Sequence, residues 1–421
     1  MKSLEQVISQ LQGYDPHALR AEQVGEFLNQ LVVPVSSTES LDLMKAANRV
    51  LSEDVISPIS VPGHDNSAMD GYAFNGQFLH TNTHFKLKVM GTALAGAMWK
   101  GKIQEGECLK IMTGAVMPNG LDTVVPIEMV QELDGSIEIS SQTLHAGDNR
   151  RLCGEDVKAG STALSKGTLL RPAALGLLAS LGFPKVSVFR RLKVAYFSTG
   201  DEVLSLGESP REGAIFDSNR YTIFGMLQRM GIEIVDMGVV RDQPTLLEEA
   251  FKQAAEESDA IITSGGVSVG EADHTKTMMS KLGDVAFWRI AMRPGRPMAV
   301  GRIGDAILFG LPGNPVAVMV TFLAFVRPAL QKMMGNEAKN SLFLKARSQE
   351  IIRKKPGRTE YQRGIVSLDA QGALQVVTTG NQGSGVLSSM VEANGLIVLH
   401  HEQGNVSAGD MIDVMMFDGV I

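Results

Sequence analysis

The amino-acid sequence predicts a multidomain α/β protein in which a central doubly wound α/β domain carries the chemistry. Its 421 residues suit two to four domains, since a domain usually holds about 100 to 200 residues. Apolar runs alternate with helix-length stretches between residues 192 and 334, which is typical of βαβ units. Short strand-like runs separated by Gly, Pro and Asn fill residues 56–150, so a β-rich unit precedes the α/β domain.

Apolar patterns outside these two units also predict helices and strands. Apolar residues recur at helical spacing over residues 4–11 and 24–31, a third helix is expected over residues 37–51, and helical periodicity returns at residues 172–182. Strand-like runs after residue 341 predict a small β domain at the C-terminal end. The expected domains are a discontinuous helical linking domain (1–55 and 151–188), an inserted β-rich domain (56–150), a central α/β domain (189–336) and a C-terminal β domain (337–421).

Within the central domain, strands and helices should alternate so that the loops after the strands share one edge of the sheet. Ligands of such sheets bind beyond the carboxyl ends of the strands. These loops should therefore carry the site. The expected strands are 192–199, 233–240, 259–264, 285–292 and 305–311, and the expected helices are 219–230, 245–257, 275–281 and 315–333.

Composition excludes several classes of protein. A net charge of -7 disfavours nucleic acid or an anionic membrane surface as a partner of the whole molecule. Two cysteines provide no disulfide framework and no paired CxxC metal site, which favours a reducing compartment. The N-terminal segment has no apolar stretch of signal-peptide length, and the longest apolar run, from Pro315, is too short to span a bilayer. A cytoplasmic protein with a buried helix at Pro315 is expected.

Two glycine-containing loops of the central domain can hold an anion. The segments "SGGVSVG" (264–270) and "LPGNP" (311–315) each lie between a strand and a helix, so backbone N–H groups and a helix N-terminus could approach a phosphate. The alternative is ordinary turn chemistry. Two such loops at one edge of a sheet favour a phosphate site.

Acidic residues follow the same strands, namely Asp201, Glu202, Asp242, Glu271 and Asp273. Carboxylates on loops often belong to a solvated rim, but carboxylates that face a phosphate would repel it unless a cation lay between them. Mg²⁺ is the natural cation, because one or two carboxylates together with substrate phosphate oxygens commonly hold it. A magnesium-dependent site is therefore expected.

Basic residues cluster in "FWRIAMRPGRP", where Arg289, Arg293 and Arg296 lie close to two prolines. The planar fork of arginine suits tetrahedral oxyanions, and its charge is permanent. Lys276 could add a fourth cation or simply begin a helix. In the β-rich domain, "PGHDNSAMDGYA" contains Asp65 and "IMTGAV" contains Thr113, both of which ordinary turns would explain. The residues alone predict an α/β enzyme that handles a nucleotide or phosphate, without naming its substrate.

Eight motifs in order resemble the molybdopterin molybdenumtransferase family, whose members include the C-terminal part of gephyrin. The motifs are "DNSAMDGYA", "MTGA", "GEDV", "FSTGDEV", "DSNR", "SGGVSVGEADHTK", "RPGRPMAVG" and "LPGNP", and the resemblance runs from about residue 41 to the end. It implies an elongated homodimer of four-domain subunits with a C-terminal domain like a β-barrel. It also implies a reaction in which molybdate enters adenylylated molybdopterin and AMP leaves, with Mg²⁺ required, and contact with the molybdopterin adenylyltransferase that supplies the substrate.

The same resemblance implies roles for individual residues. Asp242 and Asp273 would hold the divalent ion and Glu202 would assist the chemistry on the adenylate side, all as catalytic residues. Asp65 and Thr113 would reach in from the partner subunit's β domain. The substrate-binding residues would be Ser264, Gly265, Gly266, Ser268, Lys276, Arg289, Arg293, Arg296, Gly313, Asn314, Arg358 of "PGRTEYQRG" and Ser384 of "NQGSG".

Two departures from the family pattern are visible. Arginine stands at positions 289, 293 and 296, where the family often has lysine, and Ala317 stands where "PGNPVS" usually has serine. The first change keeps the charge and the second removes a hydroxyl. Three other functions remain open: a molybdopterin adenylyltransferase, which the central domain alone resembles; a scaffold of the gephyrin type, for which no long linker and partner domain is seen; and a nucleotide hydrolase that does not need pterin.

Overall fold

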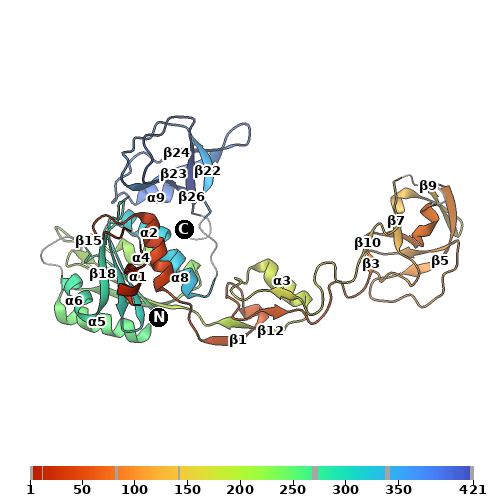
Figure 1. Ribbon diagram of the computed structural model, residues 1–421, viewed down its shortest axis with the longest axis horizontal. Coiled ribbons are helices and arrows are strands. Elements are labelled where there is room, and N and C mark those ends of the chain that lie inside the picture. The colour runs from red at the N-terminus through yellow and green to blue at the C-terminus, as the bar shows by residue number, and fades with distance from the viewer. Residues whose placement is uncertain are drawn as a thin grey trace.

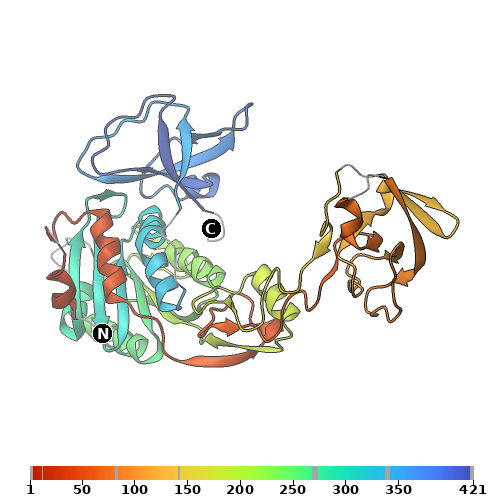
Figure 2. The ribbon, with the colours of Figure 1, turned by 45° about the vertical axis from the view of Figure 1, so that its right-hand side comes forward.

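The computed structural model describes residues 3–11, 13–80, 84–140, 143–267, 274–336 and 342–417. The molecule is elongated (Figure 1). The central α/β domain and the C-terminal β domain lie together at one end, and the β-rich unit lies at the far end, beyond a narrow connecting region. Figure 2 shows the same separation from a second direction. The multidomain α/β architecture predicted from the sequence is confirmed.

The central sheet has six strands in the order β16-β13-β17-β21-β20-β18. The first four are parallel, β20 is antiparallel to β21, and β18 is antiparallel to β20, so β18 points the same way as the parallel strands. Their carboxyl ends therefore share one edge, as predicted. The strands are β13 (Lys193–Thr199), β16 (Glu233–Val240), β17 (Ala260–Ser264), β18 (Gly283–Arg289), β20 (Pro297–Ile303) and β21 (Ala306–Leu311), and the helices around them are α4 (Ser218–Arg229), α5 (Pro244–Glu257) and α6 (His274–Leu282).

One long helix lies in the core of this domain and changes its geometry midway. It consists of α7 (Pro315–Thr321), the π-helical turn η4 (Phe322–Val326) and α8 (Arg327–Met333). Pro328 has no N–H to donate inside a helix, and the π turn just before it accommodates that loss. It spans the predicted range 315–333, and its 19 residues are long and apolar enough to cross a membrane by length and composition. However, 72% of its most apolar window is buried inside the protein, which identifies it as a core helix.

The N-terminal helices α1 (Leu4–Ile8) and α2 (Ala21–Leu31) pack on the central domain. Their apolar residues belong to the same buried cluster as the central sheet, and the Phe27 ring meets the Trp288 ring edge-on at 4.7 Å between centroids. The predicted third helix is wrong. Residues 38–42 form strand β1 (Thr38–Asp42), which pairs antiparallel with β12 (Lys185–Phe189), and a short 3₁₀ turn η1 (Leu43–Lys45) follows. Pairing with a distant strand overrode a weak helical pattern here.

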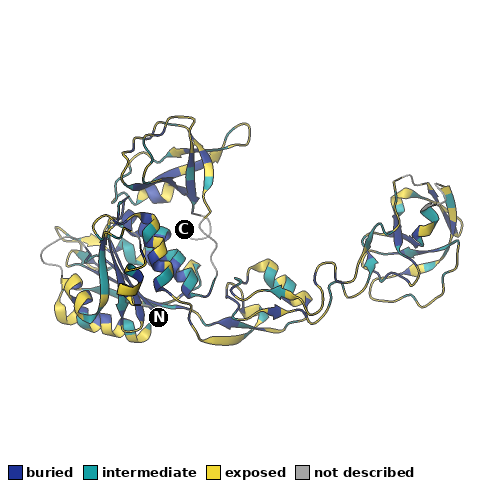
Figure 3. Ribbon diagram, viewed as in Figure 1, coloured by how far each residue is buried: buried dark blue, intermediate teal, exposed yellow. Residues whose placement is uncertain are grey.

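The connecting region is built from two separate parts of the chain. Besides the β1–β12 pair it contains β2 (Val55–Ile56) paired with β11 (Thr162–Leu164), and α3 (Pro172–Ser180). Its buried residues form a small core of their own (Figure 3). The exact limits of the domains remain a prediction.

The two β domains differ in whether their sheet closes into a barrel. The β-rich unit has a six-stranded sheet in the order β7-β4-β6-β5-β9-β8, whereas in the C-terminal domain β23 pairs with both β24 and β25, which closes a five-stranded barrel. The β-rich unit contains β3 (Asn66–Ser67), β4 (Gly71–Phe74), η2 (Gly76–His80), β5 (His84–Ala93), β6 (Glu107–Ile111), β7 (Thr123–Pro126), η3 (Ile127–Met129), β8 (Val130–Leu133), β9 (Ser136–Ser140) and β10 (Arg150–Arg151). The barrel contains β22 (Leu344–Ser348), β23 (Thr359–Leu368), β24 (Leu374–Thr378), α9 (Ser388–Glu392), β25 (Gly395–Leu399) and β26 (Met411–Met416).

A short strand joins the barrel to the central domain. β19 (Met292–Arg293) leaves the central sheet after β18 and pairs in parallel with β23, opposite Thr359 and Glu360. The barrel is thereby held beside the carboxyl edge of the central sheet, where the site was expected.

Candidate active site

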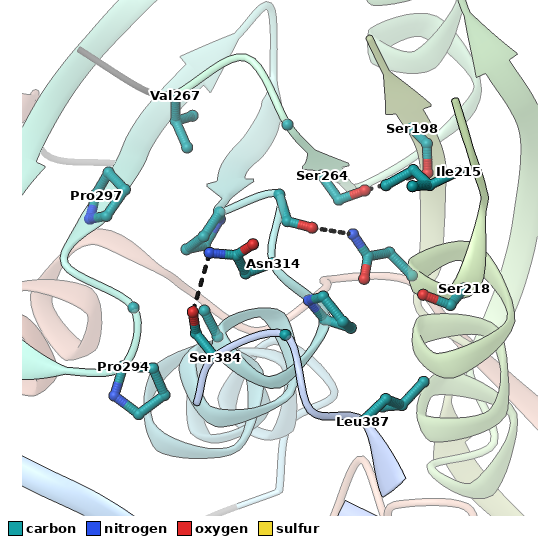
Figure 4. A pocket seen from close by; sticks show the side chains of 18 of the residues that line it. Ser198, Ile215, Ser218, Ser264, Val267, Pro294, Pro297, Asn314, Ser384 and Leu387 are labelled. Atoms are coloured by element: carbon teal, nitrogen blue, oxygen red, sulfur yellow. Dashed lines mark hydrogen bonds between the residues drawn. The ribbon is translucent and has the colours of Figure 1, made fainter. Parts of the chain in front are cut away.

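A cavity of about 980 Å³ lies at the carboxyl edge of the central sheet, between that edge and the barrel. Figure 4 shows side chains that line it from both domains. Loops that are far apart in sequence meet here because the strands they follow are neighbours in the sheet. Ten of the predicted site residues line the cavity: Glu202, Ser264, Gly265, Gly266, Arg293, Arg296, Gly313, Asn314, Arg358 and Ser384.

The Gly265–Gly266 turn needs glycine at both positions. Gly265 has φ of +91°, and a Cβ atom there would lie 2.4 Å from the carbonyl oxygen of Thr199. Gly266 has φ of +65°, and its Cβ would lie 2.4 Å from Cβ of Thr275. The backbone therefore passes close to its neighbours in a left-handed conformation that only glycine adopts readily. Because neither residue has a side chain, the backbone itself borders the cavity here, and the Gly265 N–H is held by the Leu311 carbonyl at 3.2 Å.

Three buried hydroxyl groups lie beneath this turn. Ser198 on β13 is opposite Ser264 on β17, and Tyr196 lies two residues earlier on the same face. The Tyr196 hydroxyl is 2.8 Å from each serine Oγ, and the two serine oxygens are 3.1 Å apart. Burial is the main reason why the pKa of Tyr196 is raised, with the nearby charge of Asp217 second. The tyrosine therefore stays neutral and can orient both serine hydroxyls that line the cavity.

Hydrogen bonds fix the barrel against the "LPGNP" loop (Figure 4). The Asn314 side-chain nitrogen donates to Oγ of Ser384 at 3.1 Å, and the backbone N–H of Val316 donates to the Ser384 carbonyl. On the other side of the loop, the Asn219 side-chain nitrogen donates to the Gly313 carbonyl at 2.8 Å. Ser384 thus reaches a site on another domain because its loop is bonded to the start of α7. Ala317 also lines the cavity, so the missing hydroxyl is one that would lie there.

The three arginines of the cavity have different partners. Arg293 and Arg296 are exposed and form no ion pair with any residue in the described part of the chain. Arg358 instead donates from Nε to the buried carboxylate of Glu360 at 2.8 Å. Two cations next to backbone amides, without carboxylate partners, make the cavity suited to an anion.

Some predicted residues lie outside this cavity. Arg289 ends β18, and its backbone N–H and carbonyl bond to Pro16 and Leu19. The ammonium group of Lys276 lies 4.9 Å from the centre of the Phe287 ring. Neither side chain lines the cavity. Ser268 and Asp273 lie outside the described residues.

Asp242 lies behind the cavity wall, not in it. Its Oδ1 accepts a hydrogen bond from the buried Thr275 hydroxyl at 3.2 Å, and Thr275 is 3.2 Å from the hydroxyl of Thr199, which does line the cavity. A half-buried carboxylate oxygen at this edge is a suitable ligand for a hard divalent cation. Among the residues that the structure describes, no cluster of three His, Cys, Asp or Glu side chains could hold a metal by itself.

Asp65 and Thr113 lie close together in the β-rich unit, far from the cavity of the same chain (Figure 1). Asp65 accepts a hydrogen bond from the backbone N–H of Cys153 at 2.8 Å and lies 3.6 Å from Arg150. Thr113 donates from its backbone N–H and its hydroxyl to Asp70, and these two bonds lower the pKa of Asp70. Within one subunit these residues do not complete the site.

The structure adds residues that the sequence reasoning missed. Asp217 and Asn219 of "DSNR" line the cavity, as do Ser198, Ile215 and Phe216. Arg363 is fully buried on β23, where its Nε and Nη2 bond Ser389, Asn381 and Gly383 and so support the loop that carries Ser384. Burial is the first cause that lowers the pKa of Arg363, to about 10, and repulsion from Arg293 is the second. In the sequence, Arg363 is visible only as an arginine within a strand-like run. Its burial depends on the tertiary structure and could not be predicted.

The fold and the cavity define a class of protein, namely a multidomain α/β protein with a cavity between a doubly wound sheet and a small β-barrel. The comparisons with known proteins agree. Residues 19–182 match the MoeA N-terminal region (domain I and II), residues 195–332 match a probable molybdopterin binding domain, and residues 345–417 match the MoeA C-terminal region (domain IV).

Relatives match almost the whole chain. A molybdopterin molybdenumtransferase of Haemophilus influenzae is 42% identical over 398 residues, which are 94% of this chain and 98% of the relative. One of Nostoc sp. is 36% identical over 388 residues, covering 90% and 88%. The crystal structure of the molybdopterin biosynthesis moeA protein from Pyrococcus horikoshii matches with a TM-score of 0.79 at 28% identity, covering 95% of this chain and all of that one. The chain belongs to the MoeA family of molybdopterin molybdenumtransferases.

Proposed function

We propose that this protein inserts molybdenum from molybdate into adenylylated molybdopterin and releases AMP, the last step of molybdenum cofactor biosynthesis. Family membership supports the transferase class. The observation that carries the proposal is the cavity, which the Gly265–Gly266 turn and two arginines without an ion-pair partner among the described residues line together, and whose volume of about 980 Å³ is large enough for a nucleotide-sized anion. The metal enters as substrate, so the protein must hold two anions at once.

In this proposal each group of cavity residues has one task. The glycine turn and the hydroxyl of Ser264 hold the pyrophosphate, Arg293 and Arg296 hold molybdate or the terminal phosphate, and Ser384 and Arg358 close the site from the barrel. Cleavage of the phosphoanhydride moves negative charge onto the leaving AMP phosphate, and fixed cations around it stabilise that charge. Glu202, exposed at the cavity wall, assists on the adenylate side.

We propose that the reaction requires Mg²⁺, with Asp242 and Asp273 as its protein ligands. Mg²⁺ would supply Lewis-acid neutralisation of the phosphate charge when bound. Asp242 fits this role because it is a carboxylate at the correct edge whose orientation Thr275 fixes. We also propose a cytoplasmic homodimer in which Asp65 and Thr113 of one subunit serve the cavity of the other, and which contacts the adenylyltransferase. The proposed domain limits are those given above for the four domains.

The deciding experiment measures AMP release by mass spectrometry from adenylylated molybdopterin, with and without molybdate and Mg²⁺. We expect release that depends on both, and at least a tenfold loss in Glu202→Gln, whose side chain keeps its size but loses its charge. Formation of adenylylated molybdopterin from ATP and molybdopterin would instead identify an adenylyltransferase. ATP turnover in the absence of pterin would identify a hydrolase.

A further inference from the structure

We propose that residues 215–219 form the subsite for the pterin ring, in which Asp217 and Asn219 accept hydrogen bonds from the N–H groups of its 2-amino-4-oxopyrimidine part. This inference rests on the proposed function, because it names where one portion of that substrate binds. It concerns the cavity wall formed by residues 215–219, which Asn219 joins to the "LPGNP" loop.

The first observation is a pair of buried acceptors without donors. Asp217 is 4% exposed, and its Oδ1 caps helix α4 by accepting from the Arg220 backbone N–H at 3.1 Å. Its Oδ2 has no hydrogen-bond partner among the described residues, and neither does Oδ1 of Asn219. The Asn219 amide cannot simply rotate to use the other end, because its nitrogen donates to the Gly313 carbonyl. Buried polar atoms without partners are costly, so a ligand that donates here would be favoured.

The neighbouring cation does not meet this need. The guanidinium of Arg220 is bonded through Nε and Nη2 to both carboxylate oxygens of Asp236, at 2.8 and 2.7 Å. It is therefore committed to a different carboxylate on β16. Both residues that carry the unpaired acceptors line the cavity, so a ligand in the cavity lies next to them.

The second observation is an apolar wall beside these acceptors. Ile215 is 60% exposed and Phe216 is 43% exposed, and both line the cavity on β15 (Ile215–Phe216), which pairs with β14 (Val203–Leu204). Figure 4 shows Ile215 and Ser218 on the wall opposite Pro294 and Pro297. Large apolar side chains left exposed at a cavity are typical of a ligand-binding surface. An aromatic ring and a branched side chain suit the flat face of a heterocycle.

The chemistry of the acceptors distinguishes the two rings of the substrate. A pterin presents two adjacent donors, the ring N3–H and the 2-amino group, to one side. Adenine presents its amino donor between ring nitrogens that are acceptors. A carboxylate and an amide oxygen, both acceptors, match adjacent donors and would repel the ring nitrogens of adenine. The subsite therefore fits the pterin and leaves the adenylate to the glycine turn.

The test uses the intrinsic fluorescence of 6-hydroxymethylpterin, titrated with the full-length protein. We expect Asp217→Asn to weaken pterin binding at least tenfold while AMP binding stays within twofold of the wild type. Asparagine still caps a helix N-terminus, so the fold should persist. Asp201→Asn is the matched control, since it removes an exposed carboxylate that does not line the cavity. Phe216→Ala provides a second variant, at an exposed position, and should also weaken pterin binding.

A second probe tests the donor pattern directly. The 2-oxo analogue, 6-hydroxymethyllumazine, places an acceptor where the pterin has its amino donor, and a site built for donors should reject it strongly. We expect at least tenfold weaker binding to the wild type, with little further loss in Asp217→Asn. The proposal is overturned if the wild type does not bind the pterin at millimolar concentration, if both probes bind alike, or if Asp217→Asn weakens AMP instead. Normal pterin binding without molybdate-dependent AMP release would overturn the reaction but leave the subsite intact.

Discussion

Arg293 and Arg296 are the residues on which binding of the oxyanion most depends. Both face a cavity without a carboxylate partner among the described residues, whereas Arg358 in the same cavity already bonds Glu360. A cation without a carboxylate partner contributes more to the positive potential in the cavity than one whose charge a neighbouring carboxylate already balances. Arg289 follows the same strand but bonds other segments through its backbone and does not line the cavity, so the three arginines should have unequal effects.

We expect Arg293→Ala and Arg296→Ala each to raise the molybdate concentration needed for half-maximal AMP release at least tenfold. Loss of a cation that faces a dianion should cost roughly 2 to 5 kcal/mol, while an exposed rim charge costs much less. Lysine at either position should do better than alanine. The measurement is AMP release against molybdate at fixed adenylylated pterin, with Arg289→Ala as control. Midpoints within twofold of the wild type would assign Arg293 and Arg296 to the rim.

At the scale of elements, one ion pair holds the beginning of the central sheet together. Arg190, which follows β12, bonds both carboxylate oxygens of Asp259 at 2.7 and 2.6 Å, and Asp259 also accepts from the backbone N–H of Lys193 at 2.9 Å. The pair therefore joins the connecting region to the starts of β13 and β17. Burial raises the pKa of Asp259, but the hydrogen bonds and charges of Arg190 and Lys193 outweigh it, and the pKa is lowered overall.

We expect Asp259→Asn to lower the free energy of unfolding by about 1 to 2 kcal/mol at neutral pH, since both partners are partly exposed to solvent. The folded pKa lies below the unfolded one, so this stabilisation is complete above the unfolded pKa of about 3.9 and is lost as the pH falls through the folded pKa. The measurement is urea unfolding of both proteins from pH 7 to pH 3.

The exposed Glu249, which has no ion pair within the described part of the chain, serves as control, and Glu249→Gln should change stability much less than Asp259→Asn at pH 7. The difference between Asp259→Asn and the wild type should shrink as the pH falls below about 4, because the Asp259 carboxylate is then protonated in the unfolded chain before it is protonated in the folded protein. A difference that stays constant down to pH 3 would show that charge on Asp259 is not what stabilises the sheet.

At the scale of the whole molecule, the β-rich unit is held away from the cavity of its own chain (Figure 2). Asp65 and Thr113 lie there on adjacent loops, bonded to Cys153 and Asp70 respectively. If Asp65 and Thr113 act in the reaction, they must contribute to the cavity of a second subunit. A two-fold dimer gives each subunit the same arrangement, because the same two surfaces meet twice.

We expect a mixture of Asp65→Ala and Glu202→Gln subunits, unfolded and refolded together, to recover activity that neither parent has. Random pairing makes half of the dimers mixed, and each mixed dimer has one intact site, so recovery of roughly a quarter of wild-type AMP release is expected. The control is the same mixture without the refolding step. Mixed dimers as inactive as either parent would exclude a site shared between subunits.

Much of the fold was readable from local patterns. The strands and helices of the central domain lie where periodicity predicted them, because a strand buried on both faces is a continuous apolar run and a surface helix repeats about every 3.6 residues. Strand β20 is absent from the expected strands, because it begins at the last proline of the "RPGRP" segment, whose prolines and glycine are typical of a turn. Residues 37–51 were assigned to a helix, and pairing of β1 with β12, more than 140 positions away, decided otherwise.

The sequence by itself determined the kinds of group in the site: glycines that permit left-handed turns, arginines with permanent charge, and carboxylates at strand ends. These properties belong to single residues or to their nearest neighbours in the chain. Only the tertiary structure decided which of them meet. Ser384 joins the cavity because its loop bonds Asn314, Asp242 lies behind it, and Asp217 is left with an unpaired buried oxygen. Such outcomes depend on contacts between segments distant in sequence, which burial of the whole core fixes and local propensity does not encode.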